Sequence, residues 1–443
     1  MESNSLEWRT HAGPAGRVAG PSREAVAHGA LGALVASGLV VALGLASARP
    51  PLAPYNNPGR PGWLGGPLAD LVPGLGHLAF VALLVLMAVL YVAVLARADA
   101  VGARWGIGAV VALHVVYTVA PPLVQTDIFG YLMYGRLGVL HDLVPYLHVA
   151  DEVPGDPVRD YVGWPHFPSP YGPVFTLVSY GLAALPLAVG AWALKAGIGA
   201  ASLACVALTW SCARRLGMPA LPAALLVGLN PLLLIWGVGA AHNDLLMLAL
   251  MLAGLRLALA GRTGLGAAAV VSAAAVKATS GLLLPFLVIG ASASRRRWAL
   301  AGAGATVVVL AAASVAAFGL DGVGGYLGTL YAQQQLVSGH SVPNDAFRVF
   351  GLEGLPKALK PVFSLVFLGA LGLIVHRAVR GADWITSAGW ATLALLLTMT
   401  FLMPWYLVWL LPLAALGRST RLRSATLALM GFMVVARGIV LLT

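Results

Sequence analysis

Long apolar stretches separated by short polar intervals occupy most of this chain. Stretches of this length and composition are typical of helices that cross a bilayer. Eleven of them are expected to cross, at about 28–48, 76–96, 105–121, 191–212, 218–238, 244–260, 298–318, 361–377, 384–403, 405–417 and 424–442. The pattern therefore predicts an all-α polytopic membrane protein.

Two further apolar stretches do not fit a simple crossing. The first, 174–190, is interrupted by Pro186, and the second, 265–290, has Lys277 near its middle and Pro285 beyond it. If both are short or re-entrant pieces, every cluster of basic residues falls on one side of the membrane. Broken helices at membrane depth are tolerated where they line an enclosed cavity, so we expect both pieces to wall a site.

Composition agrees with a membrane protein and excludes other classes. The 443 residues have a mean hydropathy of +0.87, with 59% hydrophobic and only 10% charged residues, which is too apolar for a soluble globule. The formal charge of +11 does not indicate nucleic acid, because the basic residues stand in short clusters between apolar stretches. Cys205 and Cys212 lie seven residues apart near one end of a stretch and are expected to pack, not to form a disulfide or a metal site.

The positions of the basic clusters also predict the topology. Residues 1–27, with Arg9, Arg17 and Arg23, are expected to form a cytoplasmic tail, and 28–443 a single domain in the plasma membrane. This orientation places two large loops, 122–173 and 319–360, on the outer face. Most acidic residues fall on that face, which indicates that the outer side uses carboxylates for chemistry.

The first outer loop opens with a carboxylate at the mouth of an apolar stretch. Asp127 follows Pro121-Pro122, and Ile128, Leu132 and Leu137 can share one face of a helix lying flat on the membrane. Thr126 or Asp127 could simply cap this helix. Asp127 could also act as a general base, because a carboxylate at an apolar boundary is less solvated. The two interpretations are compatible.

Aromatic residues alternate with prolines further along the same loop. Aromatic rings on a stiff loop suit the apolar faces of sugars, while the polar edges of the rings bond hydroxyl groups. Anchoring at the membrane interface is the alternative. The residues concerned are Tyr146, Tyr161, Trp164, His166, Phe167 and Tyr171.

Two polar clusters interrupt the apolar pattern in the middle of the chain. Asn230-Pro231 is expected to kink a helix that leads to His242-Asn243-Asp244, which either cap the next helix or face a substrate. Lys277 is the only charged residue of 265–290. An ammonium at that depth costs on the order of 3 kcal/mol, so it should meet a partner, a wet cavity or a lipid phosphate unless it snorkels to the interface.

The second outer loop carries many hydrogen-bonding groups, and a plain solvated loop would look the same. His340 and Arg348 belong to it, and Arg348 could meet an anionic head group. Met403-Pro404-Trp405-Tyr406 is an interface anchor or a cavity wall. No glycine loop for phosphates, no metal-ligand spacing and no nucleophilic triad occurs in the sequence, so no metal, cofactor or soluble nucleotide donor is expected.

Taken in order, these motifs resemble a known family. The chain has D-I-x-x-Y-x-x-x-G-R at 127–136, S-P-Y-G-P at 169–173, N-P before H-N-D, and V-K-x-x-x-x-L-L-L-P at 276–285. Over 76–417 it is similar to membrane-embedded sugar transferases of the GT-C superfamily. Within these it most resembles the actinobacterial α-1,6-mannosyltransferases that build lipomannan from polyprenyl-phosphate mannose.

The resemblance implies a metal-free, inverting transfer from a polyprenyl-phosphate sugar donor to a lipid-linked glycan acceptor at the outer face. It implies that Asp127 is the base, that Lys277, with Arg348 as a second candidate, holds the phosphate, and that His242, Asn243 and Asp244 position sugars. Many GT-C members have a second acid beside the first, but here the neighbours are Gln125 and Thr126. A second acid would therefore come from Asp142, Asp160 or Asp244. Other substrate-binding candidates are Tyr131, Arg136, Trp164, Tyr171 and His340.

Two alternatives remain at this stage. One is a GT-C enzyme that uses another polyprenyl-phosphate sugar or a different acceptor. The other is a flippase or transporter of lipid-linked sugars, which would place polar residues along a path through the membrane. Apart from Lys277, Arg256, Lys195 and Arg437, the polar groups of this chain are expected on one side, which favours the enzyme.

Overall fold

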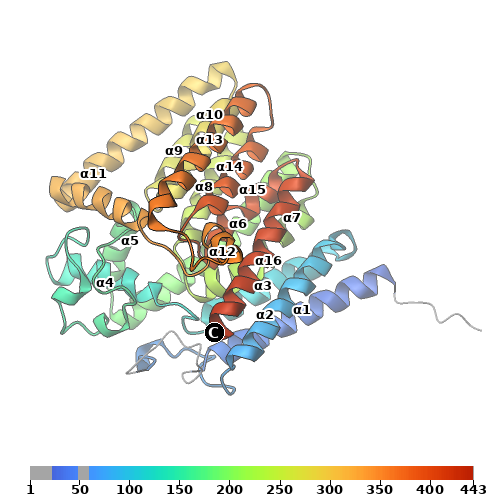
Figure 1. Ribbon diagram of the computed structural model, residues 1–443, viewed down its shortest axis with the longest axis horizontal. Coiled ribbons are helices and arrows are strands. Elements are labelled where there is room, and N and C mark those ends of the chain that lie inside the picture. The colour runs from blue at the N-terminus through green and yellow to red at the C-terminus, as the bar shows by residue number, and fades with distance from the viewer. Residues whose placement is uncertain (1–21, 48–58, 443) are drawn as a thin grey trace, which may run out of the picture.

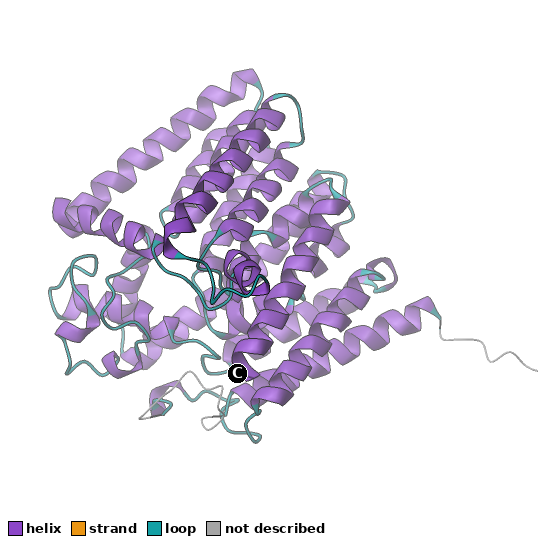
Figure 2. Ribbon diagram, in the orientation of Figure 1, coloured by secondary structure: helices purple, strands orange, loops and turns teal. Residues whose placement is uncertain are grey.

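A computed structural model describes residues 22–47 and 59–442 of the protein. Over these residues the chain forms helices and loops and no strand (Figure 2). Each of the eleven predicted stretches is helical over most of its length. The corresponding elements are α1 Arg23–Leu45, α2 His77–Leu95, α3 Ala103–Val119, α6 Leu187–Arg215, α7 Ala220–Gly228 with the π-helix η5 Leu233–Gly239, α8 Asp244–Leu259, α11 Ala293–Gln334, α13 Lys360–Val379, α14 Trp384–Thr398, η8 Pro404–Trp409 with α15 Leu411–Leu416, and α16 Thr420–Leu442.

Shorter elements connect these helices. They are α4 Asp127–Leu140, α5 Pro173–Ala183, α9 Thr263–Ala274, α10 Leu283–Gly290 and α12 Val342–Val349, with the 3₁₀ turns η1 Gly62–Leu64, η2 Ala98–Ala100, η3 Ala150–Glu152, η4 Arg159–Tyr161, η6 Ala278–Leu282 and η7 Lys357–Leu359.

Length and composition identify several helices that could span a membrane. Within the described part of the chain, five are long and apolar enough: α1, α2, α6, α11 and η7 continued by α13. The pair α7 and η5, bent by 65°, would make a sixth. The fold is thus that of an all-helical membrane protein, and the predicted number of eleven crossings stays a prediction. Most of the predicted N-terminal tail, residues 1–21, lies outside the described residues, and α1 starts at Arg23.

The helices pack into one bundle (Figure 1), whose centre is buried and whose exterior exposes many apolar side chains. All seven residues of η5 are buried, and α8 packs against both α6 and α9. By contrast, α11 and α13 expose large apolar side chains such as Val308 and Leu365, as expected where lipid replaces water around a helix.

Both predicted interruptions of the helices are present. Asn230 lies in the bend between α7 and η5, where its Oδ1 accepts hydrogen bonds from the amides of Leu232 and Leu233. The apolar stretch 265–290 is broken at Lys277, whose backbone is extended (φ −151°, ψ 121°) between α9 and η6. The other irregular stretch, 174–190, contains all of α5 but its first residue, and the beginning of α6. With 11 residues, α5 is too short to cross a bilayer.

Helix α4 differs from its prediction. The sequence predicted one apolar face lying on the membrane, but nine of its 14 residues are buried, on all sides of the helix. The reason is the close crossing with α5: a Cβ on Gly135 would come within 2.1 Å of the Ser179 carbonyl oxygen. Because Gly135 lets the two backbones touch, α4 is a buried helix and the interpretation as a surface helix was wrong.

Helix α11 bends sharply at Gly319, which has a φ of 72° that favours glycine. The bend lies close to the loop between α4 and α5, where Tyr146 stands between Phe318 and Tyr326 with ring centroids 5.0 and 5.2 Å away. The Tyr146 hydroxyl donates to the Tyr171 carbonyl oxygen at 3.0 Å. The far part of α11 therefore supports the S-P-Y-G-P segment.

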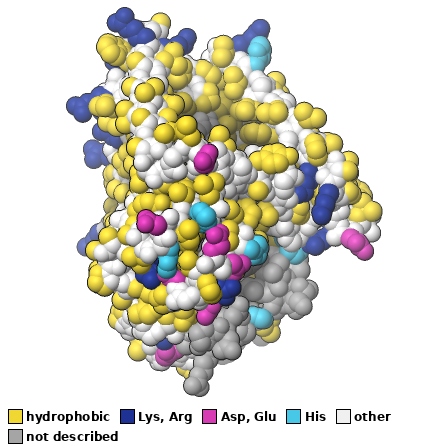
Figure 3. All heavy atoms as spheres, turned by 90° about the vertical axis from the view of Figure 1, so that its left-hand side faces the viewer, with side chains coloured by type: hydrophobic (Ala, Val, Ile, Leu, Met, Phe, Trp, Pro, Cys, Tyr) yellow, Lys and Arg dark blue, Asp and Glu magenta, His cyan; other side chains and the backbone are white. Residues whose placement is uncertain are grey.

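Charged side chains are unevenly distributed over the surface. On the face seen in Figure 3, most Lys and Arg side chains lie towards the upper end, while Asp, Glu and His side chains gather lower down, over the region of α4 and its following loop. This separation agrees with the polarity that the sequence predicts for the two ends of the helices.

Candidate active site

Asp127 stands at the start of α4, after a sharply bent segment. The Leu123 amide donates to the Gly239 carbonyl oxygen at 3.1 Å, so this segment is attached to the end of η5. The next residue, Val124, has a φ of 52°, and the Gln125 amide donates back to the Leu123 carbonyl oxygen at 2.6 Å. A β-branched residue in this region is a genuine outlier, and such strain is concentrated at functional sites.

Two side chains from distant segments contact the Asp127 carboxylate. The Tyr171 hydroxyl donates to Oδ1 at 3.3 Å, and Nε2 of His242 lies 3.5 Å from Oδ2. The side chain keeps 21% exposure. Burial alone would raise the pKa of this carboxyl, but His242, Lys277 and Tyr171 together lower it below its ordinary value of 3.8. Asp127 is therefore a carboxylate at neutral pH, with an accessible edge.

His242 has a fixed orientation. Its Nδ1 lies 2.5 Å from the Trp236 carbonyl oxygen, which can only accept, so Nδ1 carries a proton. The ring stacks on Trp405 with centroids 3.9 Å apart. Ala241, immediately before it, has a φ of 58°. These contacts direct Nε2 towards Asp127.

Asp244 and Lys277 form a buried ion pair beside these groups. The Lys277 ammonium lies 2.9 Å from both carboxylate oxygens of Asp244, and Trp409 Nε1 donates to Asp244 Oδ1 at 2.6 Å. The ammonium also stands over the rings of Tyr406 and Trp409, at 4.9 and 5.4 Å. Asp244 is fully buried and Lys277 is 14% exposed, so snorkelling is not the role of this lysine.

Tyr131 joins the two acidic groups. Its hydroxyl lies 3.4 Å from both Oδ1 and the amide of Asn243. Burial, and then Asp127 and Asp244, raise the pKa of Tyr131 well above its ordinary value. Its ring packs edge-on against Tyr171 at 4.9 Å. Tyr131 thus contacts the residue that lies between His242, the neighbour of Asp127, and Asp244, the partner of Lys277.

The S-P-Y-G-P segment and the break at Lys277 are joined directly through their backbones. The Gly172 amide donates to the Val276 carbonyl oxygen and the Val174 amide to that of Ala275, both at 3.0 Å. A Cβ on Gly172 would lie 2.2 Å from the Ala275 carbonyl oxygen, so only glycine allows this approach. This contact fixes the position of Tyr171, which bonds Asp127, relative to Lys277.

Helix capping does not explain the polar residues of the site. Thr126 and Asn243 occupy the N-cap positions of α4 and α8, yet neither side chain accepts a capping hydrogen bond. Of the three candidates for a second acid, the structure brings Asp244 into the site, whereas Asp142 and Asp160 are exposed on the loop.

Two predicted residues of the first loop lie apart from these contacts. Arg136, nine residues after Asp127 on α4, directs Nε to both oxygens of the buried Asp156, at 3.0 and 2.9 Å, and His141 bonds the same carboxylate. Trp164 is 49% exposed and lies beside His166. The structure gives Arg136 a role in folding the loop and leaves Trp164 at its surface.

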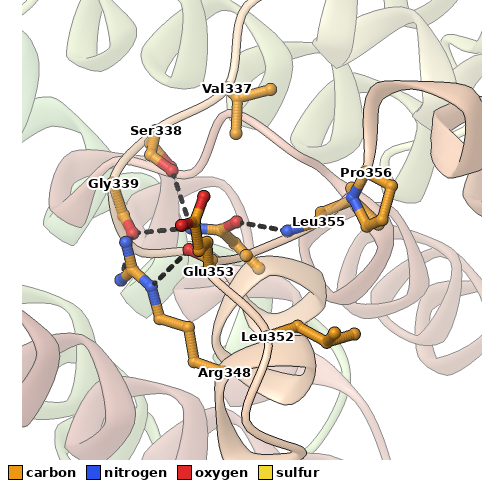
Figure 4. A pocket seen from close by; sticks show the side chains of 10 residues that line it. Val337, Ser338, Gly339, Arg348, Leu352, Glu353, Leu355 and Pro356 are labelled. Atoms are coloured by element: carbon orange, nitrogen blue, oxygen red, sulfur yellow. Dashed lines mark hydrogen bonds between the residues drawn. The ribbon is translucent and has the colours of Figure 1, made fainter.

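His340 and Arg348 lie in the second loop, where Arg348 lines an open cavity of about 580 Å³ (Figure 4). Arg348 Nη1 donates to the Gly339 carbonyl oxygen at 2.7 Å and approaches Asp345, and its Nε donates to the Glu353 carbonyl oxygen. His340 Nδ1 pairs with Asp345 at 2.9 Å. These polar groups are thus occupied within their own loop, and the chemistry of the molecule is better placed at Asp127, despite the size of this cavity.

Sequence reasoning missed several contributors. Trp409 was not singled out, although its NH bonds Asp244. Trp405, predicted as an interface anchor or a cavity wall, is buried against His242, as the second interpretation expects. Lys195 of α6 is fully buried, and its ammonium donates to the carbonyl oxygens of Gly239, at 3.0 Å, and Tyr117. Gly239 also accepts from Leu123, so Lys195 stabilises the junction between the segments of Asp127 and His242. Its lone charge in an apolar helix was the available signal.

Metal ligation was also assessed from the donor set. Within residues 22–47 and 59–442, no group of three or more His, Cys, Asp or Glu side chains could hold a metal ion. Both cysteines are buried on α6 and free, in agreement with a packing role.

Comparison with known proteins identifies relatives of the chain. A family model described as "Alpha-(1->6)-mannopyranosyltransferase, N-terminal domain" matches residues 27–293, more than half of the sequence. Alpha-(1->6)-mannopyranosyltransferase A of Mycobacterium tuberculosis is 29% identical over 70% of this chain and 64% of its own length. The protein of that name from Corynebacterium glutamicum is 33% identical over 38% of this chain and 35% of its own. This chain therefore covers less than two thirds of these relatives. No solved structure matches it.

Proposed function

The chain belongs to the alpha-(1->6)-mannopyranosyltransferase family, and we propose on this basis that it transfers mannose from polyprenyl-phosphate mannose to a hydroxyl group of a lipid-linked mannan. The observation that carries the proposal is the convergence of Asp127, a partly exposed carboxylate, with Lys277, a cation, in one site. These are the two charges that such a transfer needs, one for the acceptor hydroxyl and one for the lipid phosphate.

In the proposed reaction, Asp127 takes the proton of the acceptor hydroxyl as its oxygen attacks the anomeric carbon of the mannose. The bond between that carbon and the phosphate oxygen breaks, and its electron pair leaves with the polyprenyl phosphate. Attack from the side opposite the phosphate inverts the anomeric centre. The lowered pKa of Asp127 supports this role, because the carboxylate is ionised before the acceptor binds.

Lys277 would stabilise the charge that develops on the leaving phosphate. Its ammonium has three donors, of which the pair with Asp244 uses at most two, so one remains for a phosphate oxygen. Asp244 and Trp409 hold the ammonium in place, as an oriented cation that needs no rearrangement during the reaction. His242 lowers the pKa of Asp127 and would thereby tune its basicity.

The donor is proposed to enter from the outer leaflet, with the site on the outer face of the plasma membrane. Two features support this orientation: the basic clusters, which follow the positive-inside rule, and the gathering of acidic side chains over the region of α4 (Figure 3). Polyprenyl-phosphate sugars are membrane lipids, so a site at the end of a helical bundle suits lateral entry.

The decisive test compares two substitutions of the same kind. Purified protein carrying Asp127→Asn, incubated with radiolabelled polyprenyl-phosphate mannose and a lipid-linked mannan primer, should lose at least about 100-fold of its transfer rate, because the general base is removed and the shape is kept. Asp142→Asn is the matched control, since Asp142 is exposed and its φ of 57° is tolerated by asparagine.

An Asp127→Asn protein that transfers mannose as fast as the control would overturn the assignment of the base. The same assay with polyprenyl-phosphate glucose and polyprenyl-phosphate galactose tests the donor: mannose should be the preferred sugar by tenfold or more. Linkage analysis of the product identifies the acceptor hydroxyl.

A further inference from the structure

A second cavity, of about 300 Å³, lies at the end of the bundle remote from Asp127. Helix α3 separates the two: it starts beside the end of α2, and its far end continues to Asp127, about 25 Å away along a helix of 17 residues. The ends of four helices form its walls. They are the last turn of α2, the first turns of α7 and α16, and the end of α15. Because membrane helices end near the lipid head groups, we expect this cavity to lie at the boundary between the membrane interior and the head groups.

The lining combines one cation with an otherwise apolar wall. Leu95, Ala223, Leu226 and Leu427 are among the apolar residues, and Arg423 is the charged one. Arg423 is half-buried, and its guanidinium makes no hydrogen bond or ion pair with any residue between 22 and 47 or 59 and 442. The described part of the chain thus supplies no partner for any of the five donors of this guanidinium, which stands beside an apolar hollow.

We propose that this cavity binds an anionic phospholipid, whose phosphate meets Arg423 and whose acyl chain fills the apolar hollow. Guanidinium groups bind phosphate through paired hydrogen bonds, and basic residues at the membrane surface attract anionic lipids. Arg97 follows α2, Arg215 ends α6 and Arg421 lies in the first turn of α16, and these three raise the positive charge at this same end. A free phosphate ion would leave the apolar hollow unfilled, so the lipid is the occupant that the lining fits.

The bound lipid would stabilise the two elements that reach the other end of the molecule. Helix α7 continues through η5 to His242, and α15 follows η8, which carries Trp405 and Trp409. The cavity thus lies between α7, which leads to His242, and α15, which follows the segment of Trp405 and Trp409. The proposal concerns binding alone and does not depend on the reaction proposed above.

Binding can be measured on the purified full chain by native mass spectrometry. Dioleoyl phosphatidylglycerol should be retained at least tenfold more tightly than dioleoyl phosphatidylcholine, which has the same chains and no net charge, and it should raise the midpoint of thermal unfolding. Inorganic phosphate at the same concentration should leave that midpoint unchanged. Equal retention of the two lipids, or an equal effect of phosphate, would overturn the proposal with no variant needed.

Two substitutions locate the site. Arg423→Gln should lower phosphatidylglycerol retention about tenfold, the order expected for losing a hydrogen-bonded charge. Arg421→Gln is the matched control, because Arg421 is exposed on the same helix and does not line the cavity. Ala223→Trp should exclude the acyl chain and abolish retention of both lipids at this site. If Arg421→Gln weakens binding as much as Arg423→Gln, the attraction is a general surface effect and the site is refuted.

Discussion

The site around Asp127 and the loop around Arg348 are both rich in polar side chains, yet they are built in opposite ways. Lys277 pairs with Asp244, 33 residues away, and Trp409 bonds Asp244 across 165 residues. Arg348 finds all its partners within nine residues of itself. Polar groups that are held by distant segments are fixed by the whole fold, as a preorganised site requires. Groups that pair locally mainly shape their own loop.

The largest effect is expected when the cation of the site is removed. Lys277→Met should abolish transfer and lower the free energy of unfolding by about 3–5 kcal/mol, because the buried Asp244 carboxylate loses its counter-charge. The double variant Lys277→Met/Asp244→Asn should regain most of that stability and remain inactive. Thermal unfolding in detergent and the radiolabelled transfer assay measure the two effects.

If Lys277→Met unfolds like the wild-type protein, the ion pair is not a structural element of the site. If the double variant regains activity together with stability, the lysine serves the fold and not the donor phosphate.

A second prediction concerns the acid limb of the pH profile. His242 is the strongest of the groups that lower the pKa of Asp127, against the effect of burial. In His242→Gln that pKa should rise, so the carboxylate is protonated at a higher pH and activity is lost earlier on acidification. We expect the acid limb to move to higher pH, with a modest fall in the maximal rate.

The matched control for this experiment is His340→Gln, whose imidazole pairs with Asp345 in the second loop. Its pH profile should coincide with that of the wild-type protein. A profile of His242→Gln that also coincides would mean that this histidine does not act on the base.

The smallest effect is expected in the loop itself. Arg348→Gln should change transfer by no more than about threefold and stability by less than about 1 kcal/mol, because its side chain is 41% exposed and exposed ion pairs contribute little. The measurement is the KM for the donor together with the unfolding midpoint. A rise of tenfold or more in that KM would show that Arg348 meets the donor phosphate, as the family resemblance implied.

Much of the fold could be predicted because it depends on local patterns. The eleven apolar stretches, the bend at Asn230 and the break at Lys277 each follow from residues that are adjacent in the sequence. The surface position predicted for α4 was wrong because its burial depends on Gly135 meeting Ser179 of another helix, a contact that periodicity does not encode. Local signals give the helices and their interruptions, while packing decides which faces are covered.

The sequence predicted which residues belong to the candidate site, but not which of their side chains pair with one another. Asp127, His242, Asp244 and Lys277 each stood out as a polar residue in an apolar context, and the structure brings these four together. That Asp244 would pair with Lys277, or that Arg136 would be held by Asp156, could not be predicted from one sequence. Such pairs join segments whose separation carries no periodic signal.

The position of Tyr146 has a consequence for any shortened form of the protein. The family match ends at 293, but Tyr146, which bonds the segment of Tyr171, is held between Phe318 and Tyr326 of α11. The rings of Trp405 and Trp409 likewise come from beyond that boundary. A fragment truncated at 293 would keep all four ionisable members of the site and lose the aromatic residues that hold them. The C-terminal third of the chain therefore supplies side chains that the candidate site needs for its geometry.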